Sequence, residues 1–174
     1  MVKFFIHHNL EGDVIYLSQF YQTNMQTRKM EALMEILTAH LKSDIEREGQ
    51  VVMADTMRFS TYSIESQEYS MSSLKSLQGE FEGIQIIYCE VGGIVITMGL
   101  DDVESLFVAQ NFIQNWVAIL KRMFKTNTLT NIYDRLEELI VHLDKLLPMG
   151  NLTLINQSYL DFLKNDAVNL IKTI

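Results

Sequence analysis

Two short apolar runs flank a polar turn at the start of the chain. Residues 2–8 and 13–20 are rich in β-branched and aromatic side chains, and Asn-Leu-Glu-Gly at positions 9–12 separates them. Runs of this length and composition, joined by a turn with asparagine and glycine, are typical of two strands of a β-hairpin. The chain is therefore expected to open with a β-hairpin.

The next segment has the period of a helix. Between residues 26 and 48 the apolar positions recur every three or four residues, at Met30, Leu33, Met34, Leu37, Leu41 and Ile45. This spacing predicts a helix of about six turns with one apolar stripe. Gly49 follows it, where a helix C-cap commonly places glycine.

Three more strands are predicted in the middle of the chain. Residues 50–61 form one, and residues 84–91 and 94–100 form a hairpin around Gly92-Gly93, since both glycines can adopt positive φ. The serine-rich residues 62–80 are expected to be a solvated surface loop, with a phosphorylated or partner-binding loop as the alternative.

The remainder is predicted to be helical. Residues 103–124 are apolar on more than one face, which indicates a helix covered on more than one side. Residues 131–147 carry a narrower stripe that Pro148 and Gly150 bring to an end. Residues 157–174 contain a last amphipathic helix.

The element order is thus ββαβββαα plus a C-terminal helix. Neighbouring strands joined by hairpins pair antiparallel, so the predicted class is α+β, an antiparallel sheet flanked by helices. Neither a Pro- or Gly-rich linker nor an internal repeat divides the sequence, and residues 1–174 are expected to form a single domain.

Charge and cysteine content narrow the classes of function. The chain has 14 lysines and arginines against 22 aspartates and glutamates, a net charge of −8. So acidic a surface disfavours binding to nucleic acid and to anionic membranes by charge alone. Cys89 is the single cysteine, so an intrachain disulfide is impossible, and no apolar run suits a signal peptide or a bilayer span. A cytoplasmic protein is expected.

The candidate chemical groups do not assemble into an active site. His7 and His8 are neighbours in a strand and therefore point to opposite faces, where they cannot bind one ion together. His40 and His142 are isolated on predicted helices, and Cys89 is expected to be a buried, inert thiol. No nucleophile, phosphate-loop or metal motif is present in the sequence. No enzymatic activity, cofactor or metal is expected.

The unusual feature is surplus apolar surface on the helix of residues 103–124. Beyond the stripe that a sheet would cover, it carries Phe107, Phe112, Trp116, Met123 and Phe124. Either the C-terminal helices cover this surplus, or it forms a docking face for another protein, since aromatic residues and methionine are enriched at interface centres.

Both ends of the sequence resemble small subunits of coat complexes. Residues 1–12, Met-Val-Lys-Phe-Phe-Ile-His-His-Asn-Leu-Glu-Gly, are similar to the start of the small (sigma) subunits of clathrin-adaptor complexes, where a Met-x-Arg/Lys-Phe strand enters an Asn-x-x-Gly turn. Residues 146–163, beginning Leu-Leu-Pro-Met-Gly-Asn-Leu-Thr-Leu-Ile-Asn, are similar to the end of the sigma subunit of the fifth adaptor-protein complex. There a Leu-Pro-x-Gly-x-Leu-x-Phe-Leu-Asn run precedes the final helix.

This resemblance implies a fold and a role. The element order resembles the longin fold, a five-stranded antiparallel sheet with one helix on one face and two on the other. The implied role is that of a non-catalytic scaffold subunit in vesicle trafficking, bound to a large helical-solenoid subunit and peripheral on endosomal or lysosomal membranes only through the complex. The expected partner-binding residues are Phe107, Phe112, Trp116 and Met123, from the surplus apolar surface, together with Lys125 and Leu129, which the resemblance places at the wall of the family's dileucine pocket.

One departure from the family pattern concerns cargo. Sigma subunits that read acidic dileucine signals carry basic residues in and after the first turn, whereas Leu10 and Ile15 stand at the matching positions here, with Glu11 and Asp13 adding negative charge. An acidic rim repels an acidic peptide, so dileucine signals are not expected to bind.

Two other roles use the same fold. A longin domain could belong to a complex that regulates or exchanges nucleotide on a small GTPase, or a free-standing, for instance archaeal, longin protein could form a homodimer. A coat subunit requires a large partner, an exchange factor accelerates nucleotide release, and a homodimer assembles alone.

Overall fold

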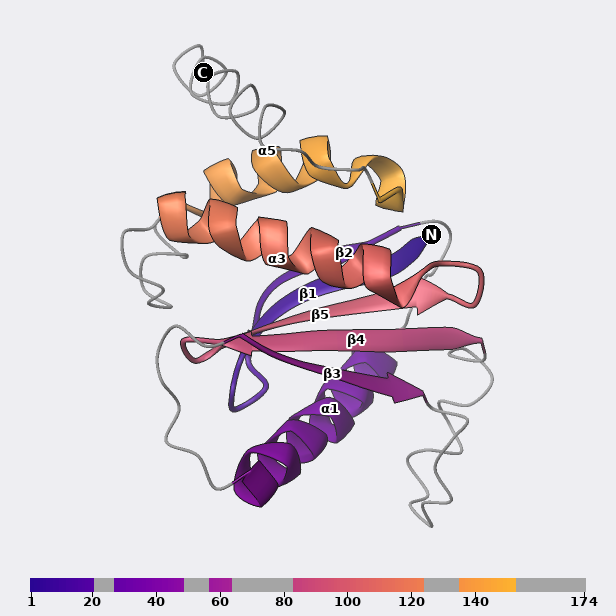
Figure 1. The fold of residues 1–174 in the computed structure, drawn as a ribbon, viewed down its shortest axis with the longest axis vertical. Coiled ribbons are helices and arrows are strands. Elements are labelled where there is room, and N and C mark those ends of the chain that lie inside the picture. The colour runs from indigo at the N-terminus through magenta and orange to yellow at the C-terminus, as the bar shows by residue number, and fades with distance from the viewer. Residues whose placement is uncertain (21–26, 49–56, 64–82, 124–134, 153–174) are drawn as a thin grey trace.

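Five strands and three helices make up the described part of the fold. The computed structural model describes residues 1–20, 27–48, 57–63, 83–123 and 135–152. The strands are β1 (Val2–Asn9), β2 (Val14–Gln19), β3 (Arg58–Ser63), β4 (Ile84–Val91) and β5 (Ile94–Asp101). The helices are α1 (Thr27–Glu48), α3 (Leu106–Met123) and α5 (Leu136–Leu146), and a short 3₁₀ turn, η2 (Pro148–Gly150), follows α5 (Figure 1).

The strands form one antiparallel sheet in the order β2-β1-β5-β4-β3. The opening hairpin closes through Asn9 and Asp13, because the Asn9 side chain accepts from the Asp13 N–H at 2.7 Å and donates to the Asp13 carboxylate at 2.8 Å. In the second hairpin Gly92 and Gly93 both have positive φ, 59° and 82°, as two-residue turns of this kind require. The predicted five-stranded antiparallel sheet is confirmed.

Helices cover both faces of the sheet (Figure 1). Helix α1 packs on one face, where its apolar stripe meets Phe4, Ile6 and Ile86. Helices α3 and α5 cover the opposite face. They bury a larger cluster that includes Phe5 of β1, Cys89 of β4 and Ile96 of β5. Successive residues of one strand thus pack on opposite faces of the sheet, because side chains alternate along a β-strand.

Most element boundaries fall within a few residues of those predicted, with three corrections. The helix predicted for 103–124 begins only at Leu106, because residues 102–105 make the turn out of β5. The strand predicted for 50–61 is described as Arg58–Ser63, so residues 62 and 63 belong to β3 and not to the serine-rich loop. The helix predicted for 131–147 is described as Leu136–Leu146.

Several other predictions concern residues outside the described ranges. These are the Gly49 cap, the remaining serine-rich residues 64–80, an N-cap at Asn131 and the C-terminal helix within 157–174.

Gly99 marks a close approach between β5 and the Phe4 ring. A Cβ at this position would lie 2.2 Å from Phe4 Cε1, and the ring is fully buried. We expect Gly99→Ala to lower the free energy of unfolding by about 1–3 kcal/mol through overpacking. Phe4→Leu removes the clashing ring atoms, so the double variant should cost clearly less than the sum of the single variants in urea unfolding. Strict additivity would contradict this explanation.

Candidate protein-docking surface

The structure separates the six predicted partner-binding residues. The side chains of Phe112 and Trp116 lie in the core of the chain and not on a docking face. Phe107 is 78% exposed. Met123 ends α3, and its side chain, like Lys125 and Leu129, lies outside the described part of the structure.

Packing on the sheet explains the burial of the two aromatic residues. Phe112 and Trp116 stand one helical turn apart and contact Phe5 of β1 edge-on, at ring-centroid distances of 6.1 and 6.2 Å. Helix α5 contributes to the same cluster through Leu139, Leu143 and Leu146. Phe112 and Trp116 therefore belong to the core between α3 and the sheet and not to surplus surface of α3.

An exposed apolar pair remains where the chain enters α3. Val103 is 89% exposed and Phe107, four residues later, is 78% exposed. We call Val103 and Phe107 the α3 entry patch. The sequence gives little indication that Val103 is exposed, since its hydrophobic pattern predicts that this residue belongs to the helix and not to the turn before it.

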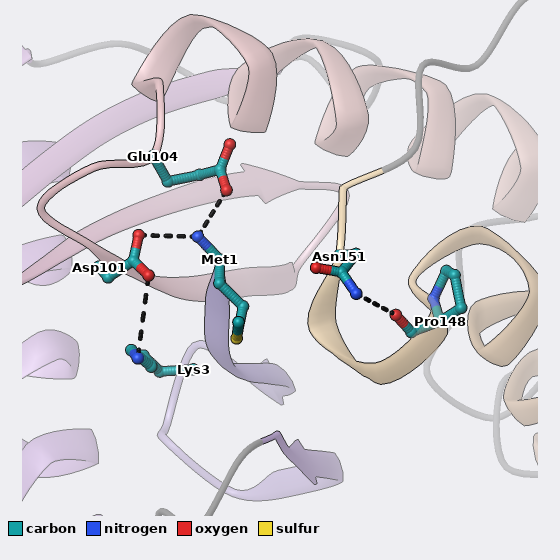
Figure 2. Close-up of polar contacts among 6 residues, drawn as sticks. All are labelled: Met1, Lys3, Asp101, Glu104, Pro148 and Asn151. Atoms are coloured by element: carbon teal, nitrogen blue, oxygen red, sulfur yellow. Dashed lines mark hydrogen bonds and ion pairs between the residues drawn. The ribbon is translucent and has the colours of Figure 1, made fainter.

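Polar contacts at the start of β1 fix the turn that carries the patch. Figure 2 shows the Met1 amino group between two carboxylates: it donates to Asp101 Oδ1 at 2.7 Å and to Glu104 Oε2 at 2.5 Å. Lys3 Nζ lies 3.8 Å from the other oxygen of Asp101. Burial alone would lower the pKa of the amino group, but the hydrogen bonds and charges of the two carboxylates raise it overall. The turn before α3 is thus tied to β1.

A second set of contacts holds residues 148–151, which follow α5. The side chain of Asn151, which follows η2, donates to the Pro148 carbonyl at 3.3 Å (Figure 2). Gly150 has φ +79°, and a Cβ at this position would lie 2.6 Å from the Val2 carbonyl oxygen. This turn keeps the end of α5 beside the start of β1.

A buried histidine–tryptophan pair connects the sheet to α3. Trp116 Nε1–H donates to His7 Nε2 at 2.8 Å, so His7 carries its proton on Nδ1. His7 Nδ1 is buried and has no hydrogen-bond partner among the described residues. Burial, with a smaller effect of neighbouring His8, lowers the pKa of His7 to about 3. His7 is a neutral core residue at physiological pH.

His8 points to the other face of the sheet, as predicted from its position in the strand. Its Nδ1 lies 2.9 Å from the Asn9 carbonyl, and its Nε2 lies 3.0 Å from Thr97 Oγ1. Burial lowers the pKa of His8 to about 4, although the hydrogen bond to Asn9 acts in the opposite direction. The two histidines therefore serve two different layers of the core.

The turn of the opening hairpin, residues 9–13, presents acids and no base. Glu11 and Asp13 are exposed, Leu10 packs partly against the cluster beneath α1, and Ile15 is buried in the cluster beneath α3. A site for an acidic peptide requires cations, and these four side chains supply none.

The described residues hold no group of three or more His, Cys, Asp or Glu side chains placed to bind a metal ion. Within 27–48, 106–123 and 136–146, where helices are described, none combines the length and apolarity that crossing a bilayer requires.

Comparison with known proteins rests on the fold. No protein-family model matches the sequence, and no curated protein sequence matches it. The structure is similar to a chain of a structure described as a homology model of the full-length AP-3 complex in a stretched open conformation. The TM-score is 0.63 at 18% identity, and the match covers 99% of this chain and 95% of the other. The fold is longin-like. At this identity the likeness establishes the fold, in agreement with the predicted five-stranded sheet and its helices.

Proposed function

We propose that the protein is a non-catalytic small subunit of a vesicle-trafficking adaptor complex, most like the sigma subunit of the fifth adaptor-protein complex. The observation that carries the proposal is the similarity of nearly the whole chain to a chain of an adaptor-complex structure, with 99% and 95% of the two chains covered. Residues 1–12 and 146–163 support it independently, since they resemble sigma subunits at both ends of the fold.

The proposed mechanism is assembly. The subunit would bury part of its surface against a large helical-solenoid subunit and would be cytoplasmic, peripheral on endosomal or lysosomal membranes only through that complex. The α3 entry patch supports this role, because Val103 and Phe107 are exposed apolar side chains, and the turn that contains Val103 is tied to β1 by the contacts of Met1 with Asp101 and Glu104. Preformed apolar anchors are typical of interface centres. Met123, Lys125 and Leu129 stay part of the proposed surface.

Affinity purification of the tagged full chain from its own cells, with mass spectrometry of the partners, tests this function. We expect one large helical-repeat protein to be recovered. In the double variant Val103→Ser/Phe107→Ser its recovery should fall at least about fivefold, because interface anchors commonly contribute about 1–2 kcal/mol each. The melting temperature should stay within about 2 °C, since both side chains are exposed.

Ile140→Ser is the matched control, since Ile140 is a partly exposed apolar residue of α5. Recovery of the large partner should be unchanged in this variant. Recovery of a small GTPase with a second longin chain would favour a nucleotide-exchange complex instead, and a chain that only self-associates would favour the homodimer. Either result contradicts the coat assignment.

A further inference from the structure

A groove lies between β2 and α1, on the sheet face opposite α3. Its volume is about 710 Å³, and its lining includes Val14, Leu17 and Gln19 of β2 together with Met30 and Met34 of α1. The groove and helix α3 lie on opposite faces of the sheet, so a ligand bound in the groove would serve a role beyond the proposed function and independent of it.

The groove exists because α1 does not reach the edge of the sheet. Among the described residues, the buried cluster beneath α1 draws on β1, β4 and β5, and β2 contributes no member. The β2 side chains on that face remain partly open: Val14 is 43% exposed and Leu17 36%. An apolar floor is thus accessible between the strand and the helix.

The rim of the groove is acidic at both ends. Glu11 and Asp13 stand at the hairpin end, and Glu31 and Glu35 stand on α1, all four exposed. Thr38 lies against Gly12 of the hairpin, so Glu35 and Glu31 lie about one and two turns farther from the hairpin. Among the lining residues that the structure describes, Lys42 is the one cation. An occupant of complementary charge carries arginine or lysine at both ends of an apolar segment.

The outer backbone edge of β2 can hydrogen-bond to a ligand in extended conformation. Among the described strands β2 is at the edge of the sheet. The Phe20 N–H donates to the Lys3 carbonyl at 2.9 Å. Because the hydrogen-bonding direction alternates along an antiparallel strand, the N–H and C=O groups of Leu17 and Gln19 point away from β1. A strand added beside β2 would hydrogen-bond to these two residues and place alternate side chains over the groove.

We propose that the β2–α1 groove binds an extended segment of a partner protein, in which apolar residues are flanked by arginine or lysine, as an additional strand on the β2 edge. Seven residues in β conformation span about 20 Å between the first and the last, which matches the six residues of β2.

The probe is a seven-residue peptide with blocked ends and a fluorophore, Arg-Thr-Val-Thr-Leu-Thr-Arg. Its alternation places arginine, valine, leucine and arginine on one face. We expect saturable binding to the full chain by fluorescence anisotropy, with a micromolar Kd that rises with salt concentration because the flanking contacts are ionic. A peptide with glutamate in place of both arginines should bind at least about tenfold more weakly.

Charge variants of the protein locate the site. Glu31→Lys/Glu35→Lys should weaken binding about tenfold or more, since two attractive contacts become repulsive. The variant keeps a like-charged pair at the same helix spacing, so helix stability changes little. Asp102→Lys/Glu137→Lys is the matched control, because both residues are exposed, lie elsewhere in the fold and change the net charge equally. Its Kd should stay within about twofold.

N-methylated peptides test whether the probe adds as a strand. One peptide is methylated at the valine and leucine nitrogens, the other at two threonine nitrogens, and these N–H groups point to opposite edges of the extended peptide. Strand addition requires one pattern to abolish binding and the other to preserve it. Equal effects of both patterns would overturn the proposal. Equal binding of the glutamate peptide, or no binding of the arginine peptide, would also overturn the proposal. A wild-type dimer in sedimentation that Leu17→Arg dissociates would overturn it as well, since a second copy of the chain would then occupy the groove.

Discussion

The protein should lose stability steadily as the pH falls from 6.5 towards 4, with a slope of up to about 2.7 kcal/mol per pH unit from His7 and His8 together. Both are neutral in the core, with pKa values lowered from 6.5 to about 3 and about 4, chiefly by burial. The unfolded chain binds protons at these residues below pH 6.5 and the folded chain does not. The unfolded state is therefore favoured by about 1.4 kcal/mol per pH unit for each histidine.

The geometry explains why the folded state resists protonation. His7 Nε2 accepts the hydrogen bond from Trp116 Nε1–H, and a proton on this nitrogen would set two donors against each other. His8 Nε2 lies 3.0 Å from Thr97 Oγ1, and this hydroxyl can rotate so that its oxygen accepts a hydrogen bond from a protonated Nε2. This difference agrees with the lower pKa of His7.

Urea unfolding between pH 5 and 7.5 measures the effect. In His7→Gln the side-chain oxygen can still accept from Trp116 but does not titrate, so the slope between pH 5 and 6 should fall by about 1.4 kcal/mol per pH unit. His8→Gln should produce a similar decrease. Any other titrating group is common to the wild type and the variants, so the differences isolate each histidine. An unchanged slope in His7→Gln would show that this residue is protonated in the folded chain.

Truncation of Trp116 should have the largest effect of any single substitution considered for α3. Trp116→Ala is expected to lower the free energy of unfolding by about 3–5 kcal/mol, because it leaves a large cavity between β1, α3 and α5. Trp116→Phe retains a ring but removes the only donor to His7 among the described residues, and should cost about 1–3 kcal/mol. Phe107→Ala, on the same helix, should change stability by less than about 0.5 kcal/mol.

Chemical unfolding followed by circular dichroism checks these values. Trp116 is the only tryptophan of the chain, so its fluorescence in the wild type reports this site directly. We expect short-wavelength emission that shifts to longer wavelength on unfolding. If Phe107→Ala destabilised the chain as strongly as Trp116→Phe, the assignment of Phe107 to the surface and Trp116 to the core would be wrong.

The local pattern of the sequence determined the secondary structure. Short apolar runs rich in β-branched and aromatic residues became β1, β2, β4 and β5. The apolar stripe beginning at Met30 became α1, because its spacing puts those side chains on one face of a helix. The Gly92-Gly93 pair specified a hairpin by its freedom to adopt positive φ. The order of strands and helices along the chain followed from these local signals, and the resemblance of that order to the longin fold implied the five-stranded sheet with helices on both faces. The opposite orientations of His7 and His8 followed in the same way.

Surface and core on α3 were decided only by the tertiary structure. Phe107, Phe112 and Trp116 look alike in the sequence, and the way α3 packs on the sheet determines which of them are buried. The groove beside β2 is also a tertiary feature, since Met30 and Met34 belong to a stripe that indicates core burial whether or not the helix reaches the sheet edge. Periodicity states which side chains share a face. How far a neighbouring element covers that face depends on residues distant in the sequence.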